Sequence, residues 1–385
     1  MKKSSFVIFF SIVLSIYGLI NLYIGVRGWE VIPENSTFRT LYLITFLVLT
    51  LSFIAGRFLE RAAISWISTV LVWIGSFWLA AMVYFLLCLL VIDILRLVQS
   101  FVPIFPASIT SDTKSTGRVI AALVIGGVLV LIVAGHINAR IPRVTQLTLT
   151  VHKNSHPMKS LDVVAASDIH LGTIISKNRL ETIVEKINSL HPDLVLLPGD
   201  VVDEDLGPVI KQNLGETLRK IRAPLGTVAI TGNHEYIGGV EPACRYMVEH
   251  GITVLRDEFI KINDSVYVVG REDRSIRQFS GRKRKPLEDL MRGIDNTYPI
   301  ILLDHQPFRL DEAASQRVDL QLSGHTHHGQ LWPLNFITRQ VYELSWGYTQ
   351  RGSTHIYVSC GVGTWGPPVR TGNYAEIVHI HLLFA

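Results

Sequence analysis

The second half of the sequence contains five short polar clusters whose residue types could bind metal ions. They are rich in aspartate, histidine and asparagine, and each directly follows a run of apolar residues. Carboxylate, imidazole and amide groups supply the oxygen and nitrogen ligands that hard or borderline divalent metals prefer. One cluster alone is compatible with an ordinary turn, but five in succession indicate a metal site. In chain order they are Asp168-Ile169-His170, Gly199-Asp200, Gly232-Asn233-His234-Glu235, Asp304-His305 and Gly324-His325-Thr326-His327.

The apolar runs before these clusters predict the strands that position them. Helical spacing over Asn178–Leu190 separates the first two runs, and this alternation predicts an α/β fold with a covered sheet. Ligand sites in open α/β sheets assemble at the carboxyl ends of the strands. We therefore expect the five clusters to meet in space. The predicted strands are Val163–Ala166, Leu194–Pro198, Leu225–Thr231, Pro299–Leu303 and Val318–Leu322.

Taken together, the motifs resemble those of the calcineurin-like metallophosphoesterases over residues 161–383. Gly199–Asp203 is one of the core motifs that carry this resemblance. The stretch Ser323–Gln330 and the tail Tyr357–Gly363 with Pro368-Val369-Arg370 are most similar to the membrane-bound branch, transmembrane proteins with a metallophosphoesterase domain. The resemblance implies a four-layer α/β/β/α sandwich for residues 161–385. It also implies two divalent metal ions, with Mn²⁺ our first expectation and iron or zinc as alternatives.

The same resemblance implies which residues bind each metal. Two cations about 3.5–4 Å apart clamp a phosphoryl group and lower the pKa of a water molecule, which gives hydroxide near neutral pH. Asp200 is expected to bridge the two ions. The implied ligands are Asp168, His170, Asp200 and His327 for the first metal, and Asp200, Asn233, His305 and His325 for the second.

Four further residues are candidates for roles beside the metals. His234 matches the family's histidine that stabilises the charge on phosphorus or protonates the leaving group, and Asp203 matches the carboxylate that orients it. Arg370 is a candidate contact for the substrate phosphate. His328 is expected to face solvent or to lie beside the substrate.

The first 138 residues have a different composition. They carry 14 charged side chains, whereas the remainder carries 54. Four apolar stretches are long enough to cross a hydrocarbon core of about 30 Å, and the length of the third leaves five spans as an alternative. We therefore predict a multi-pass membrane region over residues 1–138 and a linker over 139–160. The stretches are Phe6–Ile24, Phe38–Gly56, Ala63–Leu95 and Val119–Ile137.

Charge indicates the orientation and the partners. With the N-terminus inside, the inner segments hold seven Lys and Arg residues and the outer segments five. This difference favours a multi-pass protein of the cell membrane whose C-terminal domain is cytoplasmic. The net charge of +4 is small and scattered, which argues against a nucleic-acid partner. The sequence does not predict an oligomeric state.

We thus expect a membrane-tethered hydrolase of phosphoric esters. The short connection to the last span favours a phosphorylated lipid or lipid-linked nucleotide as substrate, and the resemblance makes a pyrophosphate of the UDP-2,3-diacylglucosamine type one candidate. The alternatives are a general phosphodiesterase or phosphatase localised to the membrane, and a non-catalytic membrane sensor or transporter that binds phosphorylated ligands.

Overall fold

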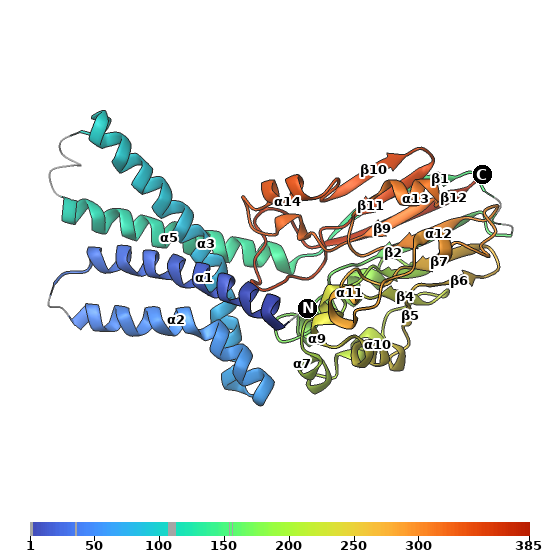
Figure 1. Cartoon of the computed structure of the whole chain (residues 1–385), viewed down its shortest axis with the longest axis horizontal. Helices are drawn as coiled ribbons and strands as arrows, with labels where there is room; N and C mark the ends of the chain where they lie inside the picture. Colours follow the sequence, from blue (N-terminus) through green and yellow to red (C-terminus); the bar gives the residue numbers. More distant parts are fainter. Residues whose placement is uncertain (1–2, 35–36, 107–112, 154, 156) are drawn as a thin grey trace. The chain divides into compact units, whose positions relative to one another are not determined.

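The chain folds into two compact units, Met1–His136 and Ile137–Ala385. The computed structural model describes residues 3–34, 37–106, 113–153, 155 and 157–385 (Figure 1). Each unit has its own interior, and each is described separately below.

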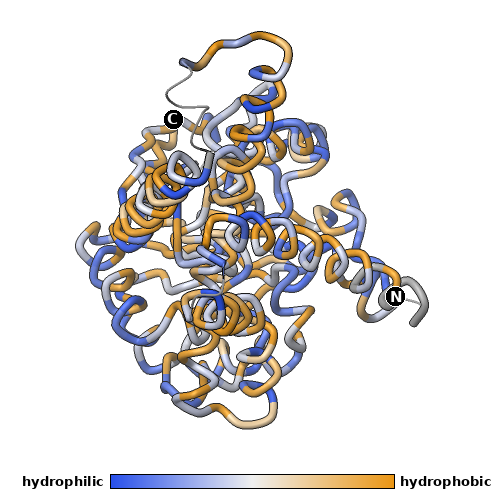
Figure 2. Tube along the Cα trace, turned by 90° about the vertical axis from the view of Figure 1, so that its left-hand side faces the viewer, coloured by the Kyte–Doolittle hydropathy of each residue, from blue (hydrophilic) through white to orange (hydrophobic). Residues whose placement is uncertain are grey.

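The first unit is built from helices that are long and apolar enough to cross a membrane. Hydrophobic residues dominate them (Figure 2). The third apolar stretch, whose length allowed five spans as an alternative, forms a single helix of 36 residues. The helices are α1 (Lys3–Val31), α2 (Thr37–Ala62), α3 (Trp66–Phe101) and α5 (Thr113–Arg140), whose last residues belong to the second unit.

Close packing and buried polar contacts hold the first three helices together. A Cβ atom on Gly75 of α3 would lie 2.2 Å from the backbone nitrogen of Phe53 in α2, so the two helices approach more closely than any larger residue permits. Inside the bundle the indole nitrogen of Trp78 donates to Asn21 Oδ1 over 2.9 Å. Ser65 caps the N-terminus of α3 and shares a capping box with Ser68.

The second unit contains two six-stranded sheets (Figure 1). The first has the order β1-β12-β2-β3-β4-β5 and the second β10-β11-β9-β8-β7-β6. Both have a parallel centre, because β2 to β5 run parallel in one and β7, β8, β9 and β11 in the other. The strands are β1 (Arg143–Val151), β2 (Ser160–Ala165), β3 (Leu194–Leu197), β4 (Thr227–Ile230), β5 (Thr253–Leu255), β6 (Glu258–Ile262), β7 (Val266–Gly270), β8 (Ile300–Leu303), β9 (Leu320–Ser323), β10 (Gly347–Arg351), β11 (Thr354–Val358) and β12 (Glu376–Phe384).

The main core lies between the two sheets, where Val163 and Leu196 of the first pack in one cluster with Val268 and Leu322 of the second. The outer face of the second sheet packs against α12 and the segment around Met291. Buried faces of α6, α8 and α10 cover the first sheet. This is the expected α/β/β/α sandwich. The helical elements are α6 (Lys177–Asn188), α7 (Leu206–Lys211), α8 (Leu214–Leu218), α9 (Asn233–Gly238), α10 (Val240–Glu249), α11 (Ile276–Ser280), α12 (Leu287–Leu290), α13 (Asp311–Ser315), η1 (His327–Gly329) and α14 (Asn335–Val341).

Residues 139–160, which we expected to be a linker, contain a strand of the first sheet. Strand β1 pairs in parallel with β12, from Arg143 opposite Glu376 to Val151 opposite Phe384. Only two residues separate β1 from the end of α5. The last turn of α5 is also fixed to the second unit, since Asn138 Nδ2 donates to the carbonyls of Arg370 and Asn373 over 2.9 and 2.7 Å.

Candidate metal centre

The five polar clusters follow the carboxyl ends of β2, β3, β4, β8 and β9, as the sequence predicts. The backbone turns sharply after several of these strands, and five of the candidate ligands have left-handed backbone angles. This conformation is uncommon outside glycine and persists where surrounding contacts hold it in place. The turns direct side chains from both sheets toward one another. The five residues are Asp168 (φ 53°), His170 (54°), Asp200 (51°), His325 (72°) and His327 (45°).

One group of ligand atoms belongs to Asp168, His170 and His327. The Nε2 atoms of the two histidines lie 3.0 Å apart, and Nε2 of His327 lies 3.5 Å from Asp168 Oδ1. All three residues are buried. Their ligand atoms lie within 4.8 Å of one another, which is close enough for one ion to contact them all.

A second group surrounds Asp200, whose Oδ2 atom lies 3.1 Å from His305 Nε2. The Oδ1 atom of Asn233 lies 2.7 Å from His325 Nδ1 and 3.3 Å from His305 Nε2. Asp200 Oδ2 is also 3.9 Å from Nε2 of His170 in the first group. The Asp200 carboxylate therefore lies between the two groups, where a bridging ligand has to be.

Glu235 joins the loops that carry these ligands. One carboxylate oxygen accepts from the backbone nitrogens of Gly232 (2.7 Å) and Asp200 (3.2 Å), and the other from Val202 (2.9 Å). Glu235 is fully buried. Glu235 therefore supports the loops that carry Asp200 and Asn233.

Burial and neighbouring charge prepare these groups for metal binding. Although burial alone would raise the pKa of Asp200, the charges of His305, His234 and His170 hold it well below its usual value. Burial lowers the pKa of His325 to about 4, and burial together with His170 and Arg370 lowers the pKa of His327 well below its usual value. Because metals bind the carboxylate and the neutral imidazole, these shifts favour coordination. His305 is shifted the other way: burial would lower its pKa, but the charge of Asp200 outweighs burial and raises it, so His305 has to release a proton when it binds a metal.

Two observations show that the residues present fit a metal. The buried Oδ2 atom of Asp168 has no hydrogen-bond partner within the described part of the chain, which is costly for a carboxylate unless a cation satisfies it. In addition, a Cβ atom on Gly324 would lie 2.2 Å from the same oxygen, so only glycine leaves the carboxylate room beside β9. Together with the Asp/His/Asn donor set, these features suit a divalent ion.

His234 and Asp203 form a pair at the edge of the ligand groups. Nδ1 of His234 lies 3.0 Å from Asp203 Oδ1, while the backbone nitrogen of His234 donates to Asp200 Oδ1 over 2.8 Å. Burial lowers the pKa of His234, but the negative charges of Asp200 and Asp203 outweigh it and raise the pKa to about 9. In the metal-free chain His234 is therefore cationic near neutral pH.

The structure buries the two residues that we expected near the substrate. The Arg370 guanidinium donates to the carbonyls of Cys360, Gly361 and Gly363 over 2.6–3.0 Å, and Nη2 lies 3.4 Å from His327 Nδ1. Its side chain is wholly inaccessible to solvent. These bonds hold the tail loop against a candidate ligand and leave Arg370 no exposed surface for a phosphate.

His328 is likewise enclosed, and it does not face solvent. Its Nδ1 atom lies 2.9 Å from Ser345 Oγ, and its ring lies 5.1 Å from that of Trp346. Burial lowers the pKa of His328, and the nearby positive charge of Arg339 lowers it further. The side chain packs the turn after β9 and does not point into open space.

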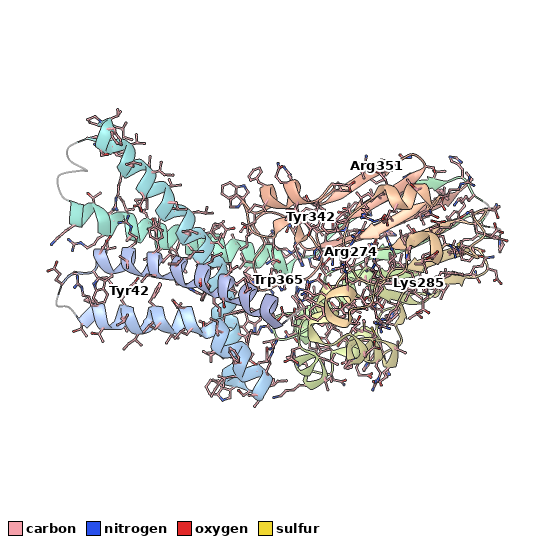
Figure 3. The ribbon with its side chains drawn as sticks, in the orientation of Figure 1. Tyr42, Arg274, Lys285, Tyr342, Arg351 and Trp365 are labelled. Carbon is pink, nitrogen blue, oxygen red and sulfur yellow. The ribbon has the colours of Figure 1, made fainter. Side chains whose placement is uncertain are left out.

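Two aromatic residues near the ligands, the exposed Trp365 and the half-buried Tyr342, were not predicted as site residues. The ring of Trp365 lies 5.9 Å from that of His234 and is 53% exposed, and Gln330 hydrogen-bonds both its backbone nitrogen and its carbonyl. The ring of Tyr342 lies 5.9 Å from that of His325 (Figure 3). No local sequence pattern connects Trp365 with His234, because the two residues are about 130 positions apart in the chain.

The sandwich and the convergent ligand groups define a binuclear metallohydrolase type of site. Comparison with known proteins gives the family. The calcineurin-like phosphoesterase family model matches residues 161–329. An uncharacterized metallophosphoesterase of Aquifex aeolicus is 31% identical over 63% of this chain and 92% of its own length. The chain belongs to the calcineurin-like metallophosphoesterases, a family that uses a dinuclear centre of divalent metals.

Two further relatives match more of the chain than the family model does. A transmembrane protein with metallophosphoesterase domain from Bos taurus is 33% identical over 66% of this chain and 60% of its own length. An uncharacterized metallophosphoesterase of Campylobacter jejuni is 27% identical over 98% of both chains. The chain spans about 60% of the length of several of the curated relatives that it matches.

Among solved structures, a 5'-nucleotidase precursor from Thermus thermophilus is 14% identical over 58% of this chain and 54% of its own, with a TM-score of 0.34. A dimetal phosphatase from Danio rerio is 10% identical over 56% of this chain and 90% of its own, with a TM-score of 0.33.

Proposed function

We propose that this protein is a membrane-tethered, two-metal hydrolase of phosphoric esters. The observation that carries the proposal is the position of Asp200, whose carboxylate lies between two groups of buried ligand atoms. The family membership supports the same activity. A sensor or transporter that only binds phosphorylated ligands would have no need of a paired histidine and carboxylate beside the ligands.

The ligand sets proposed from the sequence agree with this geometry. Asp168, His170, Asp200 and His327 would hold one ion, and Asp200, Asn233, His305 and His325 the other. When bound, such ions polarise a phosphoryl group and provide hydroxide near neutral pH. Manganese is our first choice of metal, with iron and zinc as alternatives, because an Asp/His/Asn donor set accepts all three.

The remaining chemistry belongs to His234. The contact between its Nδ1 atom and Asp203 fixes the orientation of the ring and leaves Nε2 as the atom that donates a proton. A cationic His234 stabilises negative charge that develops on the phosphoryl oxygens, and it protonates the leaving oxygen. The exposed ring of Trp365 beside it would contact the leaving group.

The proposed substrate is a phosphorylated lipid or lipid-linked nucleotide, cleaved at the cytoplasmic face. Only two residues of chain separate the membrane helix α5 from the first strand of the catalytic unit, so the linker between them is short. A lipid headgroup is concentrated at such a surface. The UDP-2,3-diacylglucosamine type of pyrophosphate is one candidate.

A kinetic comparison tests the lipid substrate. In detergent solution we expect kcat/KM for an acylated substrate to exceed that for its deacylated headgroup. Equal values would remove the lipid proposal while leaving the hydrolase proposal intact.

The same assay tests the proposed contact between Trp365 and the leaving group. Trp365→Ala should raise KM, whereas Trp332→Ala, which removes an equally exposed tryptophan, should not.

A further inference from the structure

The membrane unit contains a cavity of about 1,040 Å³ that is open on one side. Residues of α1, α2, α3 and α5 line it, and all of them lie between Ile24 and Ile132, within the first unit. The volume matches the upper end of the range of about 300–1,000 Å³ that is common for small-molecule sites. The cavity is separate from the candidate metal centre, and none of its lining residues enters the proposed function.

The cavity exists because α5 is not packed closely against the other helices. Helices α2 and α3 approach each other closely along their length, and α1 makes a few close approaches to both. Helix α5 makes fewer still to any one of them. The walls are mostly apolar, with Phe46 and Trp78 on one side and Val124 and Val128 of α5 on the other. An apolar cavity does not hold ordered water but takes up apolar ligands. Within a bilayer, the apolar material available is a lipid acyl chain.

One part of the cavity wall is strongly basic. The five basic residues assigned to the outer segments, which weaken the positive-inside bias, all line this cavity. They come from the ends of α1 and α3 and the beginnings of α2 and α5, so four helices bring their charges to one place. They are Arg27, Arg39, Arg96, Lys114 and Arg118.

The described residues do not neutralise all of this charge. Arg27 pairs with Asp93 over 2.5 Å and with Glu30 over 3.1 Å, and Asp93 is also 3.8 Å from Arg96. Within the described ranges, by contrast, Arg39, Lys114 and Arg118 have no acidic partner. The buried Nε atom of Arg39 has no hydrogen-bond partner there either. Two acidic residues, Glu30 and Glu34, also line the cavity, but the five basic residues outnumber them, so this part of the cavity is complementary to an anion.

We propose that this cavity binds a phospholipid with an anionic headgroup. Its acyl chains would fill the space between α5 and the other helices, and its phosphate would be held by Arg39, Lys114 and Arg118. Basic pockets between membrane helices bind anionic headgroups in this way. A helix that spans a bilayer has its ends on opposite faces, so a headgroup at the beginning of α5 is remote along the helix from the phosphoesterase domain that follows its end. This lipid is thus distinct from the substrate.

Lipid retention by the full-length protein tests the charge complementarity. The protein is equilibrated in detergent with equal amounts of phosphatidylglycerol and phosphatidylcholine, repurified, and analysed by native mass spectrometry. We expect one phosphatidylglycerol per chain and about tenfold less phosphatidylcholine. Combining Arg39→Gln, Lys114→Gln and Arg118→Gln should abolish the preference, and Arg61→Gln at the other end of α2 should preserve it. Equal retention of both lipids by the wild type would overturn the proposal.

A second comparison tests the apolar part of the cavity. Ala121 lines it, whereas the neighbouring Ala122 is exposed and does not. Ala121→Trp should displace the lipid and Ala122→Trp should retain it, so equal retention contradicts the proposal. A wild-type chain that retains no lipid and elutes as a dimer would also overturn it, because a second copy then covers α5. Asp200→Asn should retain phosphatidylglycerol; its loss would mean that the lipid occupies the phosphoesterase site instead.

Discussion

His234 is the residue whose substitution separates catalysis from metal binding. Its Nδ1 atom contacts Asp203, and neither proposed ligand set includes its ring. His234→Ala should therefore retain both metals while the rate falls by about 10²–10⁴-fold, the usual contribution of a positioned acid or base. Asp203→Asn should give a smaller loss of kcat, because the imidazole remains but is no longer oriented by a charge. Metal content by elemental analysis and kcat for an aryl phosphodiester measure the two effects.

Glu185→Gln, which removes an exposed carboxylate on α6, serves as the control and should change neither quantity. If His234→Ala instead loses its metals, His234 is a ligand and the division of roles proposed here is wrong.

Arg370 should contribute to the stability of the folded domain. Its guanidinium satisfies the carbonyls of Cys360, Gly361 and Gly363 in a fully buried position. Arg370→Met leaves these groups unpaired and should lower the free energy of unfolding of the domain by about 3 kcal/mol or more. Thermal unfolding measures this, and Arg370→Lys should recover only part of it because an ammonium group cannot reach all three carbonyls. A rise in KM without loss of stability would instead restore the substrate contact expected from the sequence.

At the scale of elements, β1 should be indispensable to the second unit. It pairs with β12, and Thr145 Oγ1 of β1 donates to the buried carboxylate of Glu376 over 2.7 Å. That carboxylate also accepts from Tyr357 and Trp346. A chain beginning at residue 161 exposes the edge of β12 and should aggregate, whereas one beginning at residue 139 should remain soluble. Size-exclusion chromatography distinguishes the two, and a monodisperse shorter chain would show that β1 is dispensable.

The elements also show what the sequence can and cannot predict. Strands β2, β3, β4, β8 and β9 were found to within a few residues because each is a continuous apolar run that ends in ligand residues. Strand β1 was missed because Thr145, Gln146 and Thr148 interrupt its apolar residues and its partner lies about 230 residues further along the chain. A pairing of that separation leaves no local pattern. The burial of Arg370 and His328 could not be predicted for the same reason. The two side chains are buried by contacts of the folded tail and of the turn after β9, which no local pattern shows.

At the scale of the whole molecule, the chain joins an apolar unit with few charges to a unit that contains all of the proposed chemistry. Strand β1 follows α5 after only two residues. The central claim is that this second unit holds two metals on a shared Asp200 and uses them to hydrolyse phosphoric esters.

The most direct test is the metal content and turnover of the purified full-length protein and of Asp200→Asn. We predict about two divalent ions per chain and hydrolysis of a generic phosphoester for the wild type, and neither for Asp200→Asn, since one carboxylate serves both ions. Asp311→Asn, which alters a carboxylate that is 79% exposed, should behave as the wild type. Full activity in Asp200→Asn, or a wild type that binds two metals and hydrolyses no phosphoester, would contradict the account.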